Sequence, residues 1–334
     1  MQQVIDVHTH VVPAKFPPSL RGRAGWPSME PAQACHRNIM IDGKVYRTLS
    51  DRCWDVSKRV SDMDAMRVSV QVVSPMPELF SYWLSAPVAD DLLHYINDQT
   101  AECVAASMGR LIGLAAVPLQ DLDLAIAELQ RARQTLGFAG VEVGSNVNGV
   151  PIGAAHFDSF FAEAERLDAA VFVHAVRPAG MDRLVGPKAL EQVLGYPTDI
   201  GLAAASVITA NTLERFPKLR IAFSHGGGTL ACLLPRLDEA MRVFPTVREA
   251  VHEDVYTQAR RLYYDALVYD EHTLRHLVAT FGDTGIMAGT DYPFNFHERR
   301  PVERILQMSD DTALQEKLLY KNAERFLGTA GGMQ

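Results

Sequence analysis

Two histidines spaced two residues apart, His8 and His10, are the side chains that point most directly to chemistry. They end an apolar, β-branched run that starts at Val4 and stops before Pro13, so we expect this run to form a strand. A strand repeats every two residues and places both imidazoles on one face, where they can chelate one divalent ion. The alternative is a partly exposed strand end that carries two polar residues and no ligand.

Three more side chains of metal-binding type end apolar runs later in the chain. They are His174, His225 and Asp291, at the ends of runs that begin at Val171, Ile221 and Ile286. If these runs are parallel strands of one barrel, their carboxyl ends face one mouth, where the side chains meet His8 and His10. A lone histidine after a strand is usually structural, but four strands ending in this way favour a shared site. Three imidazoles and a carboxylate suit zinc.

His225 precedes three glycines, Gly226–Gly228, at the point where a helix should begin. Glycine lets backbone and ligand approach closely and leaves N–H groups free for an anion, so a phosphate loop is the rival interpretation. The segment lacks the Gly-Lys-Ser/Thr that such a loop requires. His225 itself has two open roles, as a metal ligand or as a general acid and base.

One zinc ion is satisfied by four protein ligands and a water. The four are His8, His10, His174 and Asp291. His225 is then free to exchange a proton with that water, whose pKa the metal lowers, while Asp291 both ligates and relays protons. The fourth strand run, Val141–Gly144, holds no lysine that could be carbamylated to bridge two metals. The sequence therefore predicts one zinc per subunit and no organic cofactor.

Short apolar runs of strand type recur along the chain, separated by stretches long enough for helices. This alternation is typical of parallel βαβ units, and eight repeats favour a closed (β/α)₈ TIM barrel over an open sheet. The expected strands are Val4–His10, Ser69–Ser74, Arg110–Val117, Ala139–Gly144, Ala170–His174, Leu219–Ser224, Leu262–Ala266 and Gly285–Gly289. The expected helices include Ala89–Ala106, Asp123–Leu136, Ala154–Leu167, Gly201–Phe216 and Glu271–Phe281.

A single barrel domain over residues 1–334 is predicted, because no low-complexity linker or step in composition divides the chain. Residues 11–60, rich in Pro, Gly and Arg, interrupt the first βα unit. A loop of this length in a compact barrel is usually functional, so we expect an inserted cap subdomain over the mouth.

The composition excludes several classes of function. With 48% hydrophobic and 22% charged residues, the chain can bury a large core, and its formal charge of -8 argues against a nucleic-acid surface. No apolar run reaches the length of a membrane span. The four cysteines are widely spaced and no secretory signal is visible at the start, so we expect reduced thiols and a cytoplasmic location.

Beyond the strand ends, six segments of the chain resemble the amidohydrolase superfamily, and within it the 2-amino-3-carboxymuconate-6-semialdehyde decarboxylase family. The resemblance extends from about residue 4 to residue 328, and the insert around Lys44 and Arg47 is absent from most amidohydrolases. The six segments are Asp42–Arg47, Arg52–Asp55, Phe80–Trp83, Val117–Gln120, Phe223–Gly228 and Gly289–Phe294.

The resemblance implies a role for each matching residue. It makes His8, His10, His174 and Asp291 the zinc ligands, and His225 the catalytic acid and base. It assigns Arg47 to the substrate carboxylate and implies a homodimer in which Arg236 reaches across the interface into the neighbouring site. Without it, Lys44 and Arg47 would be flexible surface cations, and a solvent-facing helix cation would be the open alternative for Arg236. Further substrate contacts that it implies are Lys44, Trp83 and Phe294.

One region departs from the family pattern. After the strand-five histidine the family has Pro-Trp-Asp-Met and then a Trp-x-x-Trp arrangement, whereas this chain has Ala175–Met181 and no tryptophan after Trp83. The departure replaces an aromatic wall beside the pocket with small residues and a further cation, Arg177, which we expect to contact substrate. It leaves the metal ligands intact and changes the pocket that selects the substrate.

Non-oxidative decarboxylation of a small unsaturated or aromatic carboxylate is the function that these residues predict. Candidate substrates are 2-amino-3-carboxymuconate 6-semialdehyde and related ring-cleavage products. A zinc-dependent hydrolase or hydratase acting on a related lactone, amide or enol acid is the alternative, because the metal ligands do not discriminate between them. A third interpretation, a binding protein with a relic site, conflicts with the presence of every expected ligand together with His225.

Overall fold

An eight-stranded parallel sheet forms the centre of the computed structural model, which describes residues 3–17 and 25–329. Its strand order is β1-β5-β6-β7-β10-β11-β12-β13, so consecutive barrel strands are neighbours. All eight predicted strands are present with small differences at their ends. They are β1 (Ile5–Val11), β5 (Val70–Pro75), β6 (Leu111–Ala116), β7 (Gly140–Gly144), β10 (Ala170–His174), β11 (Arg220–Phe223), β12 (Tyr263–Asp265) and β13 (Ile286–Met287).

The barrel closes where the first strand meets the chain that follows the last. The N–H of Val7 donates to the carbonyl of Ala288 at 2.9 Å, and the N–H of His10 donates to the carbonyl of Tyr292 at 2.8 Å. In return, the N–H of Asp291 donates to the carbonyl of His8 at 2.8 Å. The predicted TIM barrel is therefore confirmed, and its closing seam carries three of the predicted site residues.

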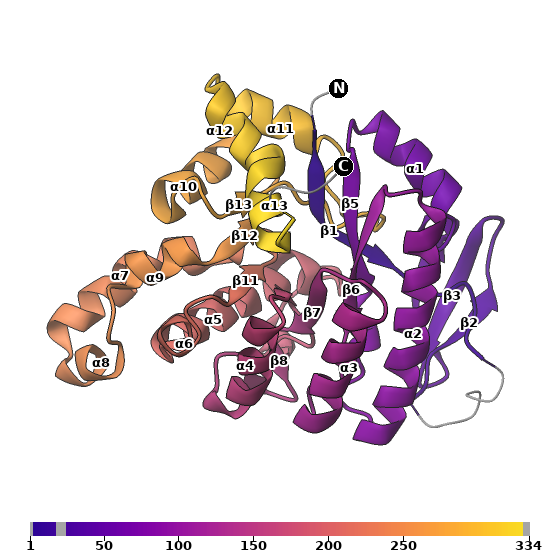
Figure 1. Ribbon diagram of the computed structural model, residues 1–334, viewed down its shortest axis with the longest axis horizontal. Helices are drawn as coiled ribbons and strands as arrows, with labels where there is room; N and C mark the ends of the chain where they lie inside the picture. Colours follow the sequence, from indigo (N-terminus) through magenta and orange to yellow (C-terminus); the bar gives the residue numbers. More distant parts are fainter. Residues whose placement is uncertain (1–2, 18–24, 330–334) are drawn as a thin grey trace.

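Helices surround the strands on the outside (Figure 1). Several begin at an aspartate whose side chain accepts a backbone N–H, as Asp121 does for α3 and Asp270 for α10. The helices are α1 (Val56–Ala65), α2 (Ala86–Ala106), α3 (Leu122–Gln134), α4 (Asp158–Arg166), α5 (Tyr196–Thr209), α6 (Thr212–Arg215), α7 (Leu230–Val243), α8 (Pro245–Ala250), α9 (Val255–Arg261), α10 (Glu271–Phe281), α11 (Pro301–Met308), α12 (Thr312–Glu316) and α13 (Asn322–Leu327).

The prediction of a single helix over Gly201–Phe216 was wrong. The structure has α5 and α6 instead, because Asn211 between them adopts a φ of 55°, a left-handed conformation that asparagine tolerates and that interrupts a right-handed helix. The expected strands Leu219–Ser224 and Gly285–Gly289 are slightly longer than β11 and β13, and the apolar runs that end at His225 and Asp291 continue past both strands. Both residues have positive φ, of 53° and 65°, and lie in turns beyond β11 and β13.

The amino-terminal end of the barrel is closed by α13. Its residues Ala323, Phe326 and Leu327 belong to one buried apolar cluster with side chains from the strands, among them Ile5 and Phe172. Because all eight strands run in the same direction, the polar side chains at their carboxyl ends gather at the opposite end of the barrel. The site is therefore built at the carboxyl end of the barrel, as the fold requires.

The chain between β1 and α1 contains an antiparallel sheet of three strands, β2 (Ser28–Pro31), β3 (His36–Ile41) and β4 (Lys44–Ser50). A tight turn at Asp42 and Gly43, both with positive φ, joins β3 to β4. Ile39 and Leu49 bury their side chains in the main apolar cluster, which fixes this sheet against the barrel. Figure 1 places it at one side of the barrel, next to α2.

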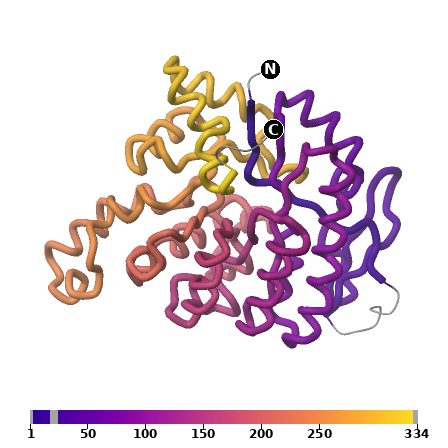
Figure 2. Tube along the Cα trace, viewed as in Figure 1, coloured from indigo at the N-terminus to yellow at the C-terminus, as the bar shows by residue number. Residues whose placement is uncertain are grey.

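Helices α7 and α8 extend away from the rest of the molecule (Figure 2). Several apolar side chains on or beside this arm are exposed, among them Leu233, Val243 and Phe244. No helix within residues 3–17 and 25–329 is long and apolar enough to cross a membrane.

Candidate metal centre and active site

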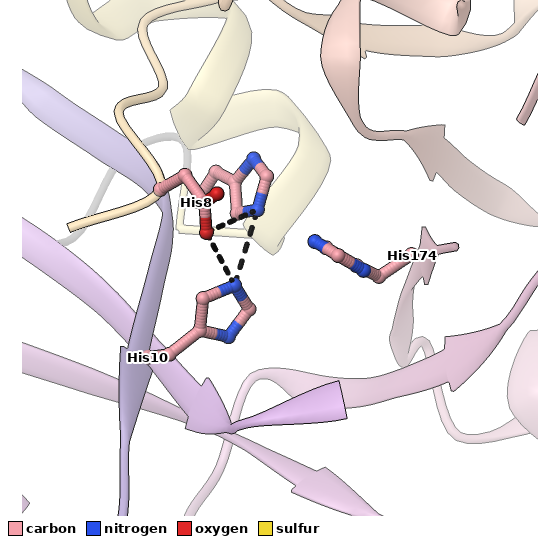
Figure 3. Close-up of side chains that lie close together, drawn as sticks. His8, His10 and His174 are labelled. Atoms are coloured by element: carbon pink, nitrogen blue, oxygen red, sulfur yellow. Dashed lines mark hydrogen bonds and ion pairs between the residues drawn. The ribbon is translucent and has the colours of Figure 1, made fainter. Parts of the chain in front are cut away.

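Four of the predicted ligands lie together at the carboxyl end of the barrel. One ligand atom from each of His8, His10, His174 and Asp291 lies within 4.8 Å of the other three. The two histidines of β1 face the last residue of β10, and Asp291 follows β13. All three imidazoles are buried, and Figure 3 shows them directed toward a common centre. Residues from three separate strands are thus brought together by the closure of the barrel.

The imidazole nitrogens that face this centre are the Nε2 atoms. Nε2 of His8 lies 3.2 Å from Nε2 of His10, which is 3.1 Å from Oδ1 of Asp291. Nε2 of His174 is buried and has no hydrogen-bond partner in the described part of the chain. A buried nitrogen without a partner is costly, and a divalent cation among these atoms would accept a lone pair from each of them. The donor set therefore fits one divalent metal ion.

The second ring nitrogen of each histidine is held by the protein. Nδ1 of His8 donates to Oδ2 of Asp265 at 2.6 Å, and Nδ1 of His174 donates to the carbonyl of Ala175 at 2.9 Å. Nδ1 of His10 lies 3.4 Å from Oγ of Ser74. A proton on Nδ1 leaves the lone pair on Nε2, so these outer partners prepare the rings for a metal.

Asp265 connects two parts of the centre and was not among the residues predicted from the sequence. Its carboxylate also accepts the N–H of His225 at 2.9 Å, the N–H of Gly226 at 2.7 Å and the N–H of Leu267 at 3.0 Å. It therefore orients His8 and the turn that carries His225 at the same time. An acidic residue at the end of a strand as apolar as Leu262–Ala266 was the available signal.

The charges around the centre balance each other. Burial lowers the pKa of His8, but its hydrogen bond to Asp265 and the charge of Asp291 outweigh burial and raise that pKa to about 9. Burial raises the pKa of Asp291, whereas the hydrogen bond to His10 and the charge of His8 bring it below its usual value. A cation at the centre would take over the role that a protonated His8 plays here, since both are positive charges facing Asp291.

His225 lies beside the four ligands without belonging to their group. Its ring centroid is 5.1 Å from that of His174 and 5.4 Å from that of His8. Burial and the positive charge of His8 lower the pKa of His225 to about 4. A neutral imidazole next to the ligand cluster can accept a proton, which is the property that an acid and base at this position needs.

Glu142 in β7 is a second residue that the sequence analysis passed over. It is fully buried, and its Oε2 lies 3.7 Å from Nδ1 of His10. Burial raises its pKa to about 7. The prediction concerned only the absence of a lysine at this strand end; the structure places a carboxyl group there, behind His10.

A cavity of about 270 Å³ opens beside the metal centre. It is lined by His174, His225 and Asp291 and, from the inserted sheet, by Arg47. The Arg47 guanidinium lies 4.6 Å from the ring centroid of Phe294, which in turn stacks on His10 at 5.2 Å. The structure thus brings Arg47 and Phe294 to the cavity beside the metal centre.

Trp83 and Arg177 lie at a second cavity, not at the one beside the metal centre. The Arg177 guanidinium is 3.3 Å from the ring centroid of Trp83, and both residues line a separate cavity of about 520 Å³ with Tyr82 and Asp199. Neither residue lines the cavity that contains His225.

Lys44 and Arg236 are both exposed, Lys44 at the start of β4 and Arg236 on α7. Neither lines the cavity beside the metal centre of its own chain.

A barrel of this kind with histidines on its first and fifth strands and an aspartate after its eighth defines a metal-dependent enzyme of the amidohydrolase type. The amidohydrolase family model matches residues 5–329, which is nearly the whole chain, so the chain belongs to this family.

Similarity in sequence to characterised relatives identifies the kind of amidohydrolase to which the chain belongs. The 2-amino-3-carboxymuconate-6-semialdehyde decarboxylase of Dictyostelium discoideum is 36% identical over 332 residues, which cover 97% of this chain and 91% of the relative. The chain is therefore a metal-dependent decarboxylase of the amidohydrolase superfamily.

Two solved structures share the fold. The IDCase of Metarhizium anisopliae in its apo form has a TM-score of 0.84 at 21% identity, over 98% of this chain and 97% of that one. The dihydroxybenzoic acid decarboxylase of Polaromonas sp. JS666, with bound manganese and the inhibitor 2-nitroresorcinol, has a TM-score of 0.80 at 21% identity, over 99% of this chain and 98% of that one.

Proposed function

We propose that this protein is a zinc-dependent, non-oxidative decarboxylase of a small unsaturated or aromatic carboxylate, such as 2-amino-3-carboxymuconate 6-semialdehyde or a related ring-cleavage product. The observation that carries the proposal is one cavity, beside the ligand group, that is lined by His174 and Asp291 together with His225 and Arg47. A role in aromatic catabolism follows from this class of substrate. The four cysteines form no disulfide, which supports a reducing, cytoplasmic setting.

One metal ion per chain would be held by Nε2 of the three histidines and the carboxylate of Asp291. Three imidazoles and one carboxylate leave a position free for a further ligand, and they suit zinc better than calcium or magnesium. When bound, the metal supplies a Lewis acid that polarises an oxygen atom and lowers the pKa of a coordinated water.

Arg47 binds a carboxylate of the substrate by charge-assisted hydrogen bonds. We propose that residues 11–60, of which 18–24 lie outside the described residues, form the cap that brings this side chain over the mouth, since Arg47 is carried by β4 of the inserted sheet. Phe294 also lines this cavity and lies between Arg47 and His10, where its ring supports the guanidinium at the cavity wall.

His225 moves the proton that decarboxylation consumes. It accepts a proton within the cavity and delivers it to the carbon that carries the leaving carboxylate, which interrupts conjugation at that carbon. The C–C bond then breaks, carbon dioxide leaves, and the electron pair of the broken bond restores the conjugated system. The net reaction replaces the carboxylate with the proton.

Product analysis tests this proposal. The zinc-loaded protein is incubated anaerobically with carboxymuconate semialdehydes and hydroxybenzoates, and released carbon dioxide is compared with incorporation of ¹⁸O from water. We expect one carbon dioxide per molecule of substrate consumed. Incorporation of ¹⁸O without carbon dioxide would contradict decarboxylation and identify a hydrolase or hydratase.

We also propose a homodimer in which Arg236 enters the partner's site. Arg236 is exposed on α7, and exposed apolar residues of the same projecting arm, such as Val243 and Phe244, offer a surface for a second copy. Arg236→Ala should raise KM without loss of zinc, because it removes a carboxylate contact worth on the order of 2 kcal/mol.

A mixing experiment decides whether the site is shared. The inactive His225→Ala chain is combined with the Arg236→Ala chain, and the two exchange subunits and are assayed at a substrate concentration far below the raised KM of Arg236→Ala. Each heterodimer should regain one working site, because one of its two sites has both residues intact. Heterodimers that form and remain inactive would show that Arg236 does not act across an interface.

A further inference from the structure

A carboxylate, Glu78, lies in the cavity that is proposed to bind a carboxylate substrate. Glu78 belongs to the short 3₁₀ helix η3 (Pro77–Phe80) after β5 and lines the cavity with His174 and His225. Its side chain is only 12% exposed. A negative charge here repels an anionic substrate. A buried carboxylate at this position therefore calls for a functional explanation.

Two phenols hold one oxygen of this carboxylate. Oε1 of Glu78 accepts hydrogen bonds from the hydroxyl of Tyr46 and, at 3.0 Å, from the hydroxyl of Tyr196. Burial and the charge of Glu78 raise the pKa of both tyrosines, so both stay protonated and act as donors. Tyr196 also packs against the imidazole of His174, with ring centroids 6.0 Å apart, which ties this group to the metal centre.

Glu78 and Arg47 are close but do not form a direct hydrogen bond. Nη2 of Arg47 is 3.9 Å from Oε1 of Glu78, well beyond the 2.7 to 2.9 Å or so of a charge-assisted hydrogen bond. The good hydrogen bonds of Glu78 therefore come from neutral donors, and its Oε2 makes none within residues 3–17 and 25–329. The cavity offers a guanidinium for an anion and, beside it, a fixed acceptor with an unused oxygen.

We propose that Glu78 is a specificity-determining residue that accepts a hydrogen bond from an amino or hydroxyl group of the substrate. The substrate class is then an amino- or hydroxy-substituted carboxylate whose donor group lies beside a carboxylate held by Arg47. Tyr46 and Tyr196 are positioning residues that fix Glu78. This inference rests on the proposed function, because it assumes a carboxylate in the cavity.

Matched pairs of ligands test it on the zinc-loaded protein. Dissociation constants are measured by calorimetry for 3- and 4-aminobenzoate and 3- and 4-hydroxybenzoate, each against its N,N-dimethyl or O-methyl counterpart. Wild type should bind at least one donor compound about 10-fold or more tightly than its methylated partner, the usual scale for a hydrogen bond to a charged group. In Glu78→Gln that ratio should fall to within about 3-fold.

The control is Glu303→Gln, which changes an exposed glutamate paired with Arg67 on the surface and should keep the wild-type ratio. Zinc content of each variant verifies that the site is intact. An equal ratio in wild type and Glu78→Gln, or no donor preference in wild type, would overturn the role of Glu78 alone. Failure of every benzoate to bind wild type would overturn the carboxylate site, and this inference with it.

Discussion

Replacing Asp265 with Asn should weaken both metal binding and the fold. The carboxylate is fully buried and accepts four hydrogen bonds, from Nδ1 of His8 and from the N–H groups of His225, Gly226 and Leu267. If the asparagine oxygen stays with Gly226 and Leu267, its NH₂ group faces the other two donors. His8 can then pair with it only by moving its own proton to Nε2, the atom directed at the metal.

The size of both effects follows from these contacts. Loss of an outer partner of a metal-bound histidine typically costs about 10- to 100-fold in metal affinity. One backbone N–H, that of His225, is left without an acceptor, which costs about 1–3 kcal/mol of unfolding free energy. Zinc affinity is measured by competition with a chromogenic chelator, and stability by urea denaturation of the metal-free protein.

Asp283→Asn is the matched control, because it makes the same change at a half-exposed aspartate paired with Lys317. It should leave zinc affinity unchanged. If Asp265→Asn binds zinc within about twofold of wild type, then Asp265 does not set the tautomer of His8, and the ligand geometry argued here is wrong.

The remaining predictions concern three other residues. His225→Ala should keep its zinc, measured by elemental analysis, and lose about two to four orders of magnitude in kcat; equal loss of zinc and activity would make His225 a ligand. Arg47→Ala should raise KM about 10- to 100-fold with zinc retained, and an unchanged KM would remove it from the substrate site. Gly228→Ala should lower the free energy of unfolding by about 1–3 kcal/mol or more, because its φ is +58° and an added Cβ would lie 1.9 Å from the carbonyl oxygen of Pro197. Wild-type stability of that variant in urea would show that the turn after β11 relaxes freely.

The eight strands were predictable because short apolar runs and helical spacing are local signals. The four ligands were predictable for a related reason: the histidines lie within β1 or at the end of β10, Asp291 follows β13, and parallel strands bring their carboxyl ends to one mouth. The break at Asn211 was missed because apolar residues resume at Leu213 and Phe216, whereas the left-handed backbone of Asn211 separates α5 from α6.

Residues that act through distant partners were missed. His8 and Asp265 form one hydrogen bond although 257 positions separate them, and no local sequence pattern at either residue predicts this contact. The proposed role of Glu78 likewise could not be predicted from the sequence. It depends on hydrogen bonds from the hydroxyls of Tyr46 and Tyr196, which lie on two other elements. Trp83, by contrast, was assigned from a motif, and a motif does not specify which of two neighbouring cavities a side chain lines.

Stoichiometric reconstitution tests the central claim most directly. Protein stripped of metal with a chelator is titrated with zinc while carbon dioxide released from the best substrate is followed. Activity should be absent at first, rise linearly and reach a plateau at one zinc per chain, whereas His174→Ala should neither hold zinc nor gain activity. Full activity in the stripped protein, or a plateau at two ions per chain, would contradict a single metal held by His8, His10, His174 and Asp291.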